Sequence, residues 1–295
     1  MDYVITYVNN QDPEWVKQYL KYKSDVPIDG ARFRDWGLLK YHLRGIEKNL
    51  PWINNVYLVV ASKSQVPEWI NTEKVHIVTH DQIIPKNFLP TFNSTCIEMF
   101  LKNIPGLDEY FIYANDDMYP VKPLVLTDYV RDEKPCVHLM KKERSNATSQ
   151  FRKVIIGCQN LILDDYENYP RPLFQKYYRP EHFPICQTKT AHERVWKNHQ
   201  EDIFKSISRF RDIRNYNQYI FIFDQVFSGE SVDIPVDGKY MDFGSKDMFY
   251  IKHEIEEPSY KILCVNDNKK APENAGEEIR KSFQKLLPQK SKYEN

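Results

Sequence analysis

The chain has 295 residues, of which only nine are glycine, and its 41 Lys+Arg balance its 41 Asp+Glu to a formal net charge of zero. So few glycines do not assemble a G-x-G-x-x-G or G-x-x-x-x-G-K-[ST] phosphate loop, and zero net charge argues against a general nucleic-acid binder. Because 41% of the residues are apolar, the chain can fill a core, which excludes collagenous and disordered classes.

Targeting signals are absent from the sequence pattern. No basic N-terminal segment precedes a long apolar stretch, and no apolar run reaches the ~20 residues needed to span a bilayer. The five cysteines contain no C-x-x-C pair, which argues against a disulfide framework and against a zinc ribbon. We therefore expect one domain over residues 1–295 in a cytoplasmic protein.

The first two-fifths of the chain alternates strand and helix signals. Strands are predicted at about 3–8, 56–61, 75–79 and 110–114. Helices are predicted at about 13–22, where Asp12 and Pro13 form an N-terminal cap, at about 36–49, and after Ser94, the expected cap of a third helix. This alternation favours a Rossmann-like, mostly parallel sheet flanked by helices.

The second half has a more helical pattern. Residues 134–158 suggest strands and loops, helical spacing returns at 190–208 and 216–227, and an amphipathic helix is predicted at 273–287. The basic stretches 141–144 and 281–292 could touch an anionic membrane, although a solvated surface explains them as well. The predicted fold class is α/β with a more helical C-terminal half.

Polar side chains follow two of the predicted strands. Asn9 to Asp12 come after the first strand, and Asn115-Asp116-Asp117 come directly after the fourth. Ligands of open α/β sheets bind at this carboxyl edge. Adjacent carboxylates suit a hard cation such as Mg²⁺ or Mn²⁺, which in turn suits a diphosphate. The alternative is that one aspartate caps the next helix and the other is solvated.

The tetrapeptide Arg-Phe-Arg-Asp occurs twice, at 32–35 and at 209–212, each time before a predicted helix. The planar guanidinium of arginine binds phosphate oxygens in bidentate fashion, and a neighbouring aspartate can orient it. A helix-capping aspartate beside two surface arginines explains either copy equally well. Two copies in a glycine-poor chain make a phosphate site plausible.

Two further segments carry candidate groups. His182 precedes Phe183-Pro184, so that a fixed histidine could act as a general base, and a structural histidine is the alternative. Residues 264–268 form a turn rich in amide and carboxylate groups after a strand-like run, which an Asx turn also explains.

In this order, these blocks resemble the Stealth family of hexose-1-phosphate transferases, which includes bacterial capsular-polysaccharide phosphotransferases. The resemblance spans nearly the whole chain, through residues 3–15, 32–117, 182–211 and 264–267 with the closing helix. The first block departs from the family pattern, because Tyr7 stands where tryptophan is common and Asn9-Asn10 stand where Asp-Gly is common.

The resemblance implies a GT-A-like core, in which residues 1–130 bind a nucleotide sugar and residues 131–295 complete the active site. It implies transfer of a hexose-1-phosphate or N-acetylhexosamine-1-phosphate from a UDP-sugar to a hydroxyl of a glycan or lipid-linked oligosaccharide. UMP would be released during capsular or cell-surface polysaccharide synthesis, by an enzyme that is cytoplasmic or peripheral at the inner face of the membrane.

Residue roles follow from the same resemblance. His182 would be the base, and the other catalytic groups would be Asp117, Arg209 and Arg211. The metal ion, Mg²⁺ or Mn²⁺, would be held by Asp117, Asn266 and Asp267. The donor would be bound by Asn9, Asp12, Arg32, Arg34, Asp35, Asn93, Ser94 and Glu98. Two alternatives stay open: a GT-A glycosyltransferase that releases UDP, and a non-catalytic sugar-nucleotide-binding component of a capsule assembly complex.

Overall fold

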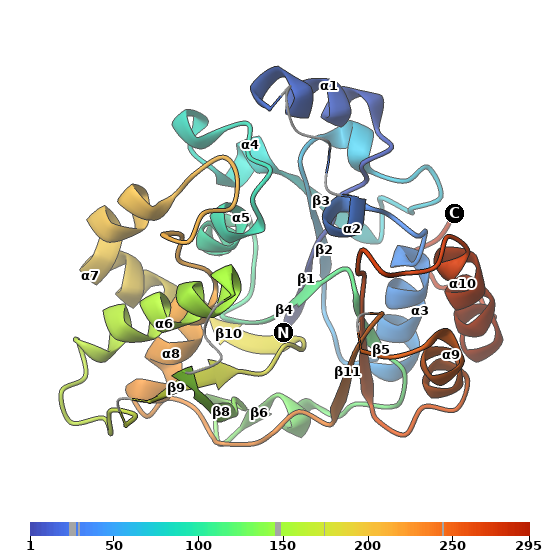
Figure 1. Ribbon diagram of the computed structural model, residues 1–295. Helices are drawn as coiled ribbons and strands as arrows, with labels where there is room; N and C mark the ends of the chain where they lie inside the picture. Colours follow the sequence, from blue (N-terminus) through green and yellow to red (C-terminus); the bar gives the residue numbers. More distant parts are fainter. Residues whose placement is uncertain (24–27, 29, 145–148, 174, 244) are drawn as a thin grey trace.

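The computed structural model describes residues 1–23, 28, 30–144, 149–173, 175–243 and 245–295. Its centre is a five-stranded sheet with the order β10-β4-β1-β2-β3 (Figure 1). Four of its strands run parallel to one another: β1 (Asp2–Thr6), β2 (Val56–Val60), β3 (Val75–Thr79) and β4 (Tyr110–Asn115). The fifth, β10 (Ile185–Thr188), joins β4 antiparallel from the second half of the chain. The predicted α/β class with a mostly parallel sheet is confirmed.

The central strands are apolar because the sheet is covered on both faces. All five residues of β2, Val-Tyr-Leu-Val-Val, are buried, as is expected for a parallel strand between two layers. Thr6 at the end of β1 is in register with Asn115 of β4 and with Val59 of β2. The residues that follow β4, β1 and β2 therefore reach the same edge of the sheet.

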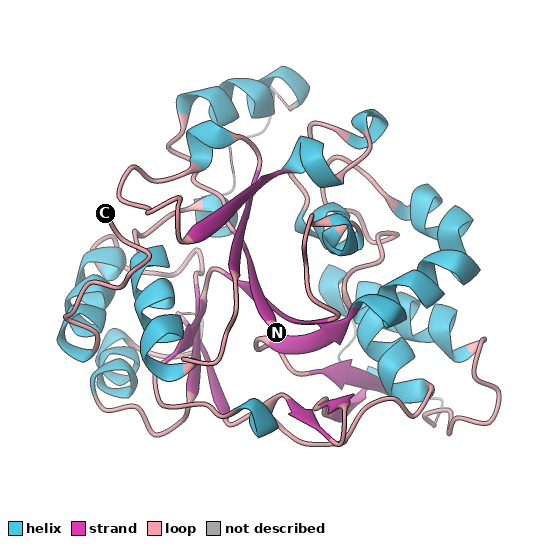
Figure 2. Ribbon diagram, turned by 180° about the vertical axis from the view of Figure 1, so that it is seen from behind, coloured by secondary structure: helices cyan, strands magenta, loops and turns pink. Residues whose placement is uncertain are grey.

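Helices pack on both sides of this sheet (Figures 1 and 2). On one side lie α6 (Gln150–Leu163), α7 (Lys189–Ser206) and α8 (Tyr219–Phe227), which share a core with β4 and β10. On the other side lie α3 (Leu39–Asn49), α9 (Met248–Glu256) and α10 (Ala275–Leu286). No helix in the described part of the chain combines the length and apolar character required to cross a membrane.

A second, three-stranded sheet continues from the first. Its strands are β11 (Gly238–Asp242), β12 (Ile262–Asn266) and β5 (Met118–Pro120), and only two residues separate β4 from β5. Helix α3 packs directly against the backbone of β5 at Gly45, where a Cβ atom, if one were present, would lie 2.4 Å from the carbonyl oxygen of Pro120. Only glycine permits this approach.

Shorter elements complete the fold. The two-stranded pairs are β6 (Val130–Arg131) with β7 (Lys134–Pro135) and β8 (Leu139–Glu143) with β9 (Lys176–Pro180). The short helices are α1 (Pro13–Tyr22), α2 (Gly30–Phe33), α4 (His80–Ile83) and α5 (Ser94–Met99). Helix α1 begins as predicted, because the Asp12 side chain accepts a hydrogen bond from the backbone N–H of Glu14 at 3.0 Å.

Several local predictions are wrong. Asn93, not Ser94, caps α5, because its side chain accepts from the backbone N–H of Thr95. Residues 134–143 do contain the predicted strands, as β7 and β8, and 145–148 lie outside the described residues, but 150–158 belong to the long helix α6, which Ser149 caps. The β-branched run Val154-Ile155-Ile156 favours a strand locally, and packing against α8 outweighs that preference.

Helix boundaries next to the Arg-Phe-Arg-Asp copies also differ from the prediction. Helix α3 begins at Leu39 rather than at Trp36, because Gly37 adopts a positive φ of 68° that does not fit a helix. Arg32 and Phe33 already belong to α2, and the second copy is followed by a turn and loop rather than by a helix, since α8 begins at Tyr219.

Candidate active site

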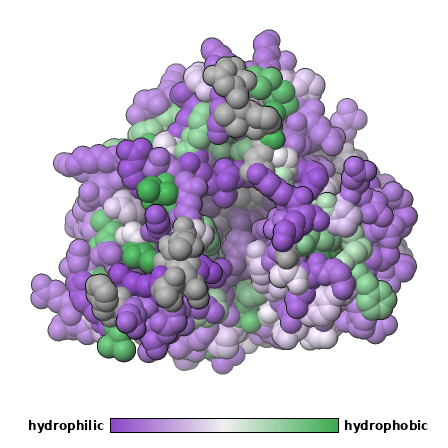
Figure 3. Space-filling view, viewed as in Figure 1, coloured by the Kyte–Doolittle hydropathy of each residue, from purple (hydrophilic) through white to green (hydrophobic). Residues whose placement is uncertain are grey.

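The carboxyl edge of the main sheet opens into a cavity of about 540 Å³, a size typical of small-molecule sites. Asp116 follows β4, Tyr7 follows β1, Ala61 follows β2 and His80 follows β3, and all four line the cavity. In the space-filling view the molecule is hollowed near the middle of one face, and hydrophilic residues predominate around the hollow (Figure 3). The sheet edge that sequence reasoning selected is therefore the wall of a pocket.

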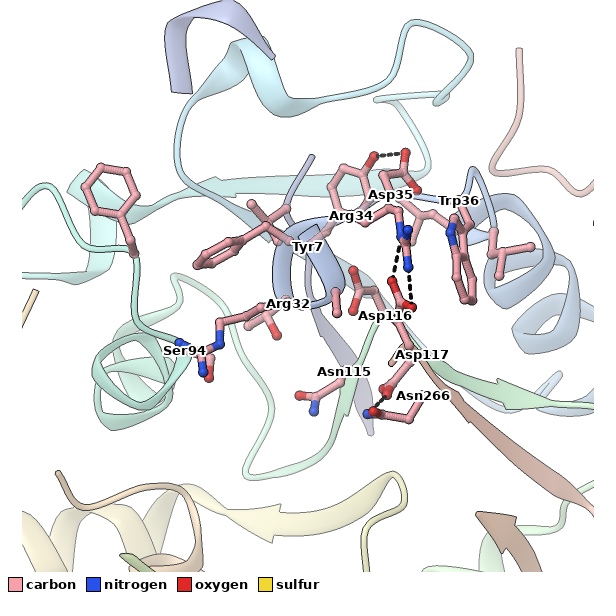
Figure 4. Close-up of a pocket in the computed structure, with 18 of the residues that line it drawn as sticks. Tyr7, Arg32, Arg34, Asp35, Trp36, Ser94, Asn115, Asp116, Asp117 and Asn266 are labelled. Atoms are coloured by element: carbon pink, nitrogen blue, oxygen red, sulfur yellow. Dashed lines mark hydrogen bonds and ion pairs between the residues drawn. The ribbon is translucent and has the colours of Figure 1, made fainter. Parts of the chain in front are cut away.

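Carboxylates gather at one end of this cavity. Asp35, Asp116 and Asp117 all line it, and the hydroxyl of Tyr7 donates to Asp35 at 2.7 Å (Figure 4). Burial, followed by the negative charges of Asp117 and Asp35, raises the pKa of Asp116 well above its usual range. The cluster therefore favours a positively charged group that would relieve the repulsion.

Strand pairing brings Asn266 to Asp117. Strand β5 starts just after Asp117 and pairs with β12, which ends at Asn266, and the backbone N–H of Val265 donates to the Asp117 carbonyl at 2.9 Å. The Asn266 amide then donates to Asp117 Oδ2 at 2.9 Å. Asp117 Oδ1 is buried and has no hydrogen-bond partner among the described residues.

These groups fit a divalent cation. An unpaired buried carboxylate oxygen next to a second carboxylate and an amide is a hard-oxygen donor set, which Mg²⁺ and Mn²⁺ prefer. The Asn266 amide would present its oxygen after a 180° rotation, because amide orientation is assigned from the hydrogen-bond network. Asp117 and Asn266 are thus brought together as the resemblance implies.

His182 and Cys264 lie close to Asp117, although neither of them lines the cavity. One ligand atom from each of the three residues falls within 4.8 Å of the others, an arrangement that could itself hold a metal ion. Burial, followed by the charge of Asp117, raises the pKa of the Cys264 thiol well above its usual range, so it stays protonated and donates to Asp117 Oδ2 at 3.5 Å. Because Mg²⁺ and Mn²⁺ prefer oxygen ligands to sulfur, we favour the oxygen donors.

The third predicted metal ligand, Asp267, is engaged elsewhere. Arg34 donates to both of its carboxylate oxygens, from Nε at 2.7 Å and from Nη2 at 2.6 Å (Figure 4). Both residues line the cavity, so this ion pair joins the segment after α2 to the turn after β12. In this conformation Arg34 and Asp267 bind each other rather than a donor or a metal.

Two arginines face the carboxylates across the cavity. Arg211 donates from Nη2 to Ser94 Oγ at 2.7 Å, while Arg32 makes no hydrogen bond or ion pair within the described residues and extends toward Ser94 (Figure 4). Enclosure by the cavity walls, followed by the positive charge of Arg32, lowers the pKa of Arg211, although its surface stays open to the cavity. This wall is therefore positive, and neither arginine forms an ion pair within the described residues.

Three of the remaining predicted residues lie behind the cavity wall or outside it. Arg209 donates to the backbone carbonyls of Pro90 and Leu89, and its guanidinium lies 3.9 Å from the ring centroid of Tyr22. Asn9 and Asp12 bond to Gln65 and fix the loop after β1. These three residues do not line the cavity.

Asn93 and Glu98 support the positive wall. Asn93 is fully buried, and its amide donates to the Ser208 carbonyl and to Asn215, which holds the loop that carries Arg211. Glu98, also buried, accepts from the backbone N–H of Gln218 at 2.9 Å and lies within electrostatic range of Arg211. Asn93 also lines the cavity, whereas Glu98 does not, so Glu98 can position Arg211 from behind the cavity wall.

Sequence reasoning missed four groups near this site. His80 and Thr91 line the cavity, and each has a buried polar atom without a partner among the described residues. Arg179, at the end of β9, has an unpartnered buried Nε and lies within electrostatic range of His182, while the Tyr240 ring lies 5.8 Å from the His182 ring. A polar residue directly after a buried strand was a usable signal for His80, but no local signal marks the others.

The carboxyl of Glu98 predicts an unusual dependence of stability on pH. Burial raises its pKa from 4.5 to about 7, so the folded state holds this proton more tightly than the unfolded state. The stabilisation is fully present below pH 4.5 and is lost as the pH rises through about 7. At pH 8, the free energy of unfolding of Glu98→Gln should therefore exceed that of the wild type by up to roughly 3 kcal/mol, which makes the variant the more stable protein.

Urea unfolding at pH values between 5 and 8 measures this difference. The gap between Glu98→Gln and wild type should widen as the pH rises, because glutamine does not ionise. The matched control is Glu201→Gln on the exposed face of α7, which should follow the wild type at every pH. A difference in unfolding free energy that stays constant across this pH range would contradict the raised pKa of Glu98.

The chain is similar in sequence to a family of known proteins. The family model described as Stealth protein CR2, conserved region 2, matches residues 32–137, a segment that includes the end of α2, many of the cavity-lining residues and Asp117. The receptor polysaccharide phosphotransferase WefC of Streptococcus gordonii is 30% identical over 335 residues, covering 100% of this chain and 98% of the relative. The chain therefore belongs to the Stealth family, whose relatives here are polysaccharide phosphotransferases.

Another relative is also named as a polysaccharide phosphotransferase. The exopolysaccharide phosphotransferase cps2G of Lactiplantibacillus plantarum is 28% identical over 100% of this chain and 96% of its own. Among solved structures, the galactosyltransferase LgtC bound to donor and acceptor sugar analogs has a TM-score of 0.49 and 10% identity, covering 99% of this chain and 96% of that one. Membership in the family makes the chain a transferase with a role in sugar-phosphate transfer.

Proposed function

We propose that this chain transfers a sugar-1-phosphate from a UDP-sugar to a hydroxyl of a glycan or lipid-linked oligosaccharide and releases UMP. The observation that carries the proposal is the pairing of two opposite walls in one cavity. Asp116 and Asp117 form a negative wall suited to a cation, and Arg32 and Arg211 form a positive wall in which neither arginine is ion-paired within the described residues. A diphosphate bound to a divalent cation complements both walls at once.

The reaction breaks one phosphate bond and forms another. The acceptor oxygen bonds to the β-phosphorus of the donor, the bond from that phosphorus to the bridging oxygen breaks, and UMP leaves with the bridging oxygen. Because the bond between the sugar carbon and its oxygen is untouched, the anomeric configuration is retained. Such a transfer depends mainly on positioning and on neutralising the charge on the phosphoryl oxygens.

His182 is the proposed acceptor of the hydroxyl proton. Burial lowers its pKa, Asp117 opposes this shift, and Arg179 and Arg211 add to it. The imidazole is therefore neutral near pH 7 and able to accept a proton. Arg32 and Arg211 would bind the phosphoryl oxygens, and Asp116, Asp117 and Asn266 would hold a Mg²⁺ or Mn²⁺ ion, which supplies further charge neutralisation when bound.

The acceptor partner and the membrane contact belong to this proposal as well. Lys281 and Lys285, in the second basic stretch, pair with Glu278 and Glu256 at 3.0 and 2.9 Å, so part of its charge is neutralised. Lys141 and Lys142 on β8 are exposed and leave the first stretch as the better candidate for an anionic membrane. Contact with a membrane stays a prediction.

The leaving nucleotide tests the proposed reaction. The protein is incubated with a panel of UDP-sugars, a glycan acceptor and either Mg²⁺ or Mn²⁺, and the nucleotides are separated. We expect UMP to accumulate in step with a phosphodiester-linked product, and we expect a chelator to stop its formation. Release of UDP would instead indicate attack at the sugar carbon and would reject the phosphoryl-transfer mechanism.

A further inference from the structure

Two buried polar side chains line the cavity away from its carboxylate wall. His80 is 6% exposed and Thr91 is 2% exposed, and both belong to the cavity lining. His80 Nε2 and Thr91 Oγ1 are fully buried; His80 Nε2 has no hydrogen-bond partner within the described residues, and Thr91 Oγ1 has only the weakly bonding Cys96 thiol beside it. Buried polar groups are normally paired, because an unpaired one loses its bonds to water without compensation. Two such groups in one cavity point to a ligand that pairs them.

The surroundings of these groups are apolar. Val8, Ala61 and Phe92 line the cavity with them, and Phe92 packs in the aromatic cluster with Trp15. An apolar site with a few precisely placed polar groups is typical of a pocket that binds a flat heterocycle and fixes its orientation. A sugar ring, with hydroxyls around its whole perimeter, would leave most of its own polar groups unpaired here.

The position of His80 in the sheet fits the length of a nucleoside diphosphate. The strand order β4-β1-β2-β3 places three strand intervals between Asp116, which follows β4, and His80, which follows β3. Neighbouring strands are spaced at roughly 4.8 Å, so the two residues are separated by about 14 Å along the sheet edge. An extended nucleotide with its diphosphate at the carboxylates would place its base near His80.

We propose that His80 and Thr91 bind the polar edge of the uracil base of the nucleotide donor and determine which base the enzyme accepts. The inference rests on the proposed function, because that function supplies the uridine donor. The edge of uracil presents a carbonyl acceptor, an N–H donor and a second carbonyl acceptor. A neutral imidazole offers one donor and one acceptor, and a hydroxyl offers both, so the two side chains can match this pattern.

The protonation state of His80 suits this role. Burial lowers its pKa to about 4, and the nearby Asp81 opposes the shift only in part, so the ring is neutral at physiological pH. The Cys96 thiol is a polar neighbour of Thr91. Burial raises the pKa of this thiol to about 11 and the Thr91 hydroxyl opposes the shift. Because a thiol is a weak hydrogen-bonding group, the hydroxyl still lacks a strong partner.

Calorimetric binding of UMP, CMP and ribose 5-phosphate to the full-length protein tests the assignment. Wild type should bind UMP more tightly than CMP, because cytosine replaces the N–H donor and one acceptor of the uracil edge. His80→Ala and Thr91→Val should each weaken UMP binding on the order of tenfold and reduce the preference for UMP over CMP. Binding of ribose 5-phosphate should be unchanged in both variants, which also reports an intact fold.

Matched controls exist close to both residues. The control variants are His76→Ala, on an exposed position of β3, and Thr72→Val, on an exposed position just before this strand. Both variants should bind UMP like the wild type. The proposal is overturned if the His80 and Thr91 variants bind UMP like the wild type, or if they lose ribose 5-phosphate to the same extent as UMP. Failure of the proposed reaction is distinct, because release of UDP by the wild type would leave these binding results unaffected.

Discussion

Replacing Asp117 with asparagine is expected to lower turnover by roughly 10³-fold, the largest effect of any single substitution in this protein. The variant keeps the shape of the side chain but removes its negative charge. Within the described residues, Asp117 is the only cavity carboxylate that has an unpaired oxygen and also bonds to Asn266. Binding of a divalent cation should weaken in parallel, which titration of Mn²⁺ in the presence of UDP measures.

Stability separates this effect from misfolding. Asp117 repels the buried Asp116, so removal of its charge should leave the melting temperature unchanged or raise it. The matched control is Asp132→Asn, in an exposed turn where the backbone φ of 50° accepts asparagine readily. An Asp117→Asn variant with full turnover would remove this residue from the active site.

Replacing Arg211 with lysine is expected to cost about 10²-fold in kcat/KM even though the positive charge is retained. The guanidinium can bind Ser94 with one nitrogen and present others to a phosphate, whereas an ammonium group lacks this fixed fork. Steady-state kinetics with the donor varied, together with UDP affinity, measure the loss. Ser94→Ala should have a smaller effect, since it removes only one contact that orients the arginine.

Arg214→Lys provides the control within the same loop. Arg214 pairs with Asp212 on the surface and does not line the cavity, so its replacement should leave kinetics and UDP binding at wild-type values. Equal behaviour of the Arg211 and Arg214 variants would mean that the charge of the loop, rather than the geometry of Arg211, is what the reaction needs.

The repeated tetrapeptide illustrates how far sequence reasoning reaches. Two identical Arg-Phe-Arg-Asp segments identified a positive wall, and each copy does contribute one arginine to it, Arg32 from the first and Arg211 from the second. In each copy the other arginine binds the protein itself, since Arg34 pairs with Asp267 and Arg209 bonds to backbone carbonyls. The sequence does not show which arginine faces the cavity and which binds the protein, because this depends on the surface that lies opposite each side chain.

The strand ends were more predictable than the contacts between distant segments. A buried apolar run followed by polar residues located Asp116 and Asp117 at the sheet edge, and the same rule applied to 75–79 would have located His80. The meeting of Asp117 with Asn266 depends on the pairing of β5 with β12, which lie about half the chain apart. Pairing at such separation follows from packing of the whole fold, so the sequence could suggest the residues but not their geometry.

Gly45, one of the nine glycines, does not line the cavity but affects it through the contact between α3 and β5. Any side chain at position 45 would meet the carbonyl of Pro120 at 2.4 Å, so it could be accommodated only if β5 moved away from the helix. Strand β5 starts at Met118, directly after the carboxylate that is proposed to hold the cation. The absence of a side chain at Gly45 thus lets β5 lie close to α3, and the position of Asp117 just before β5 depends on this contact.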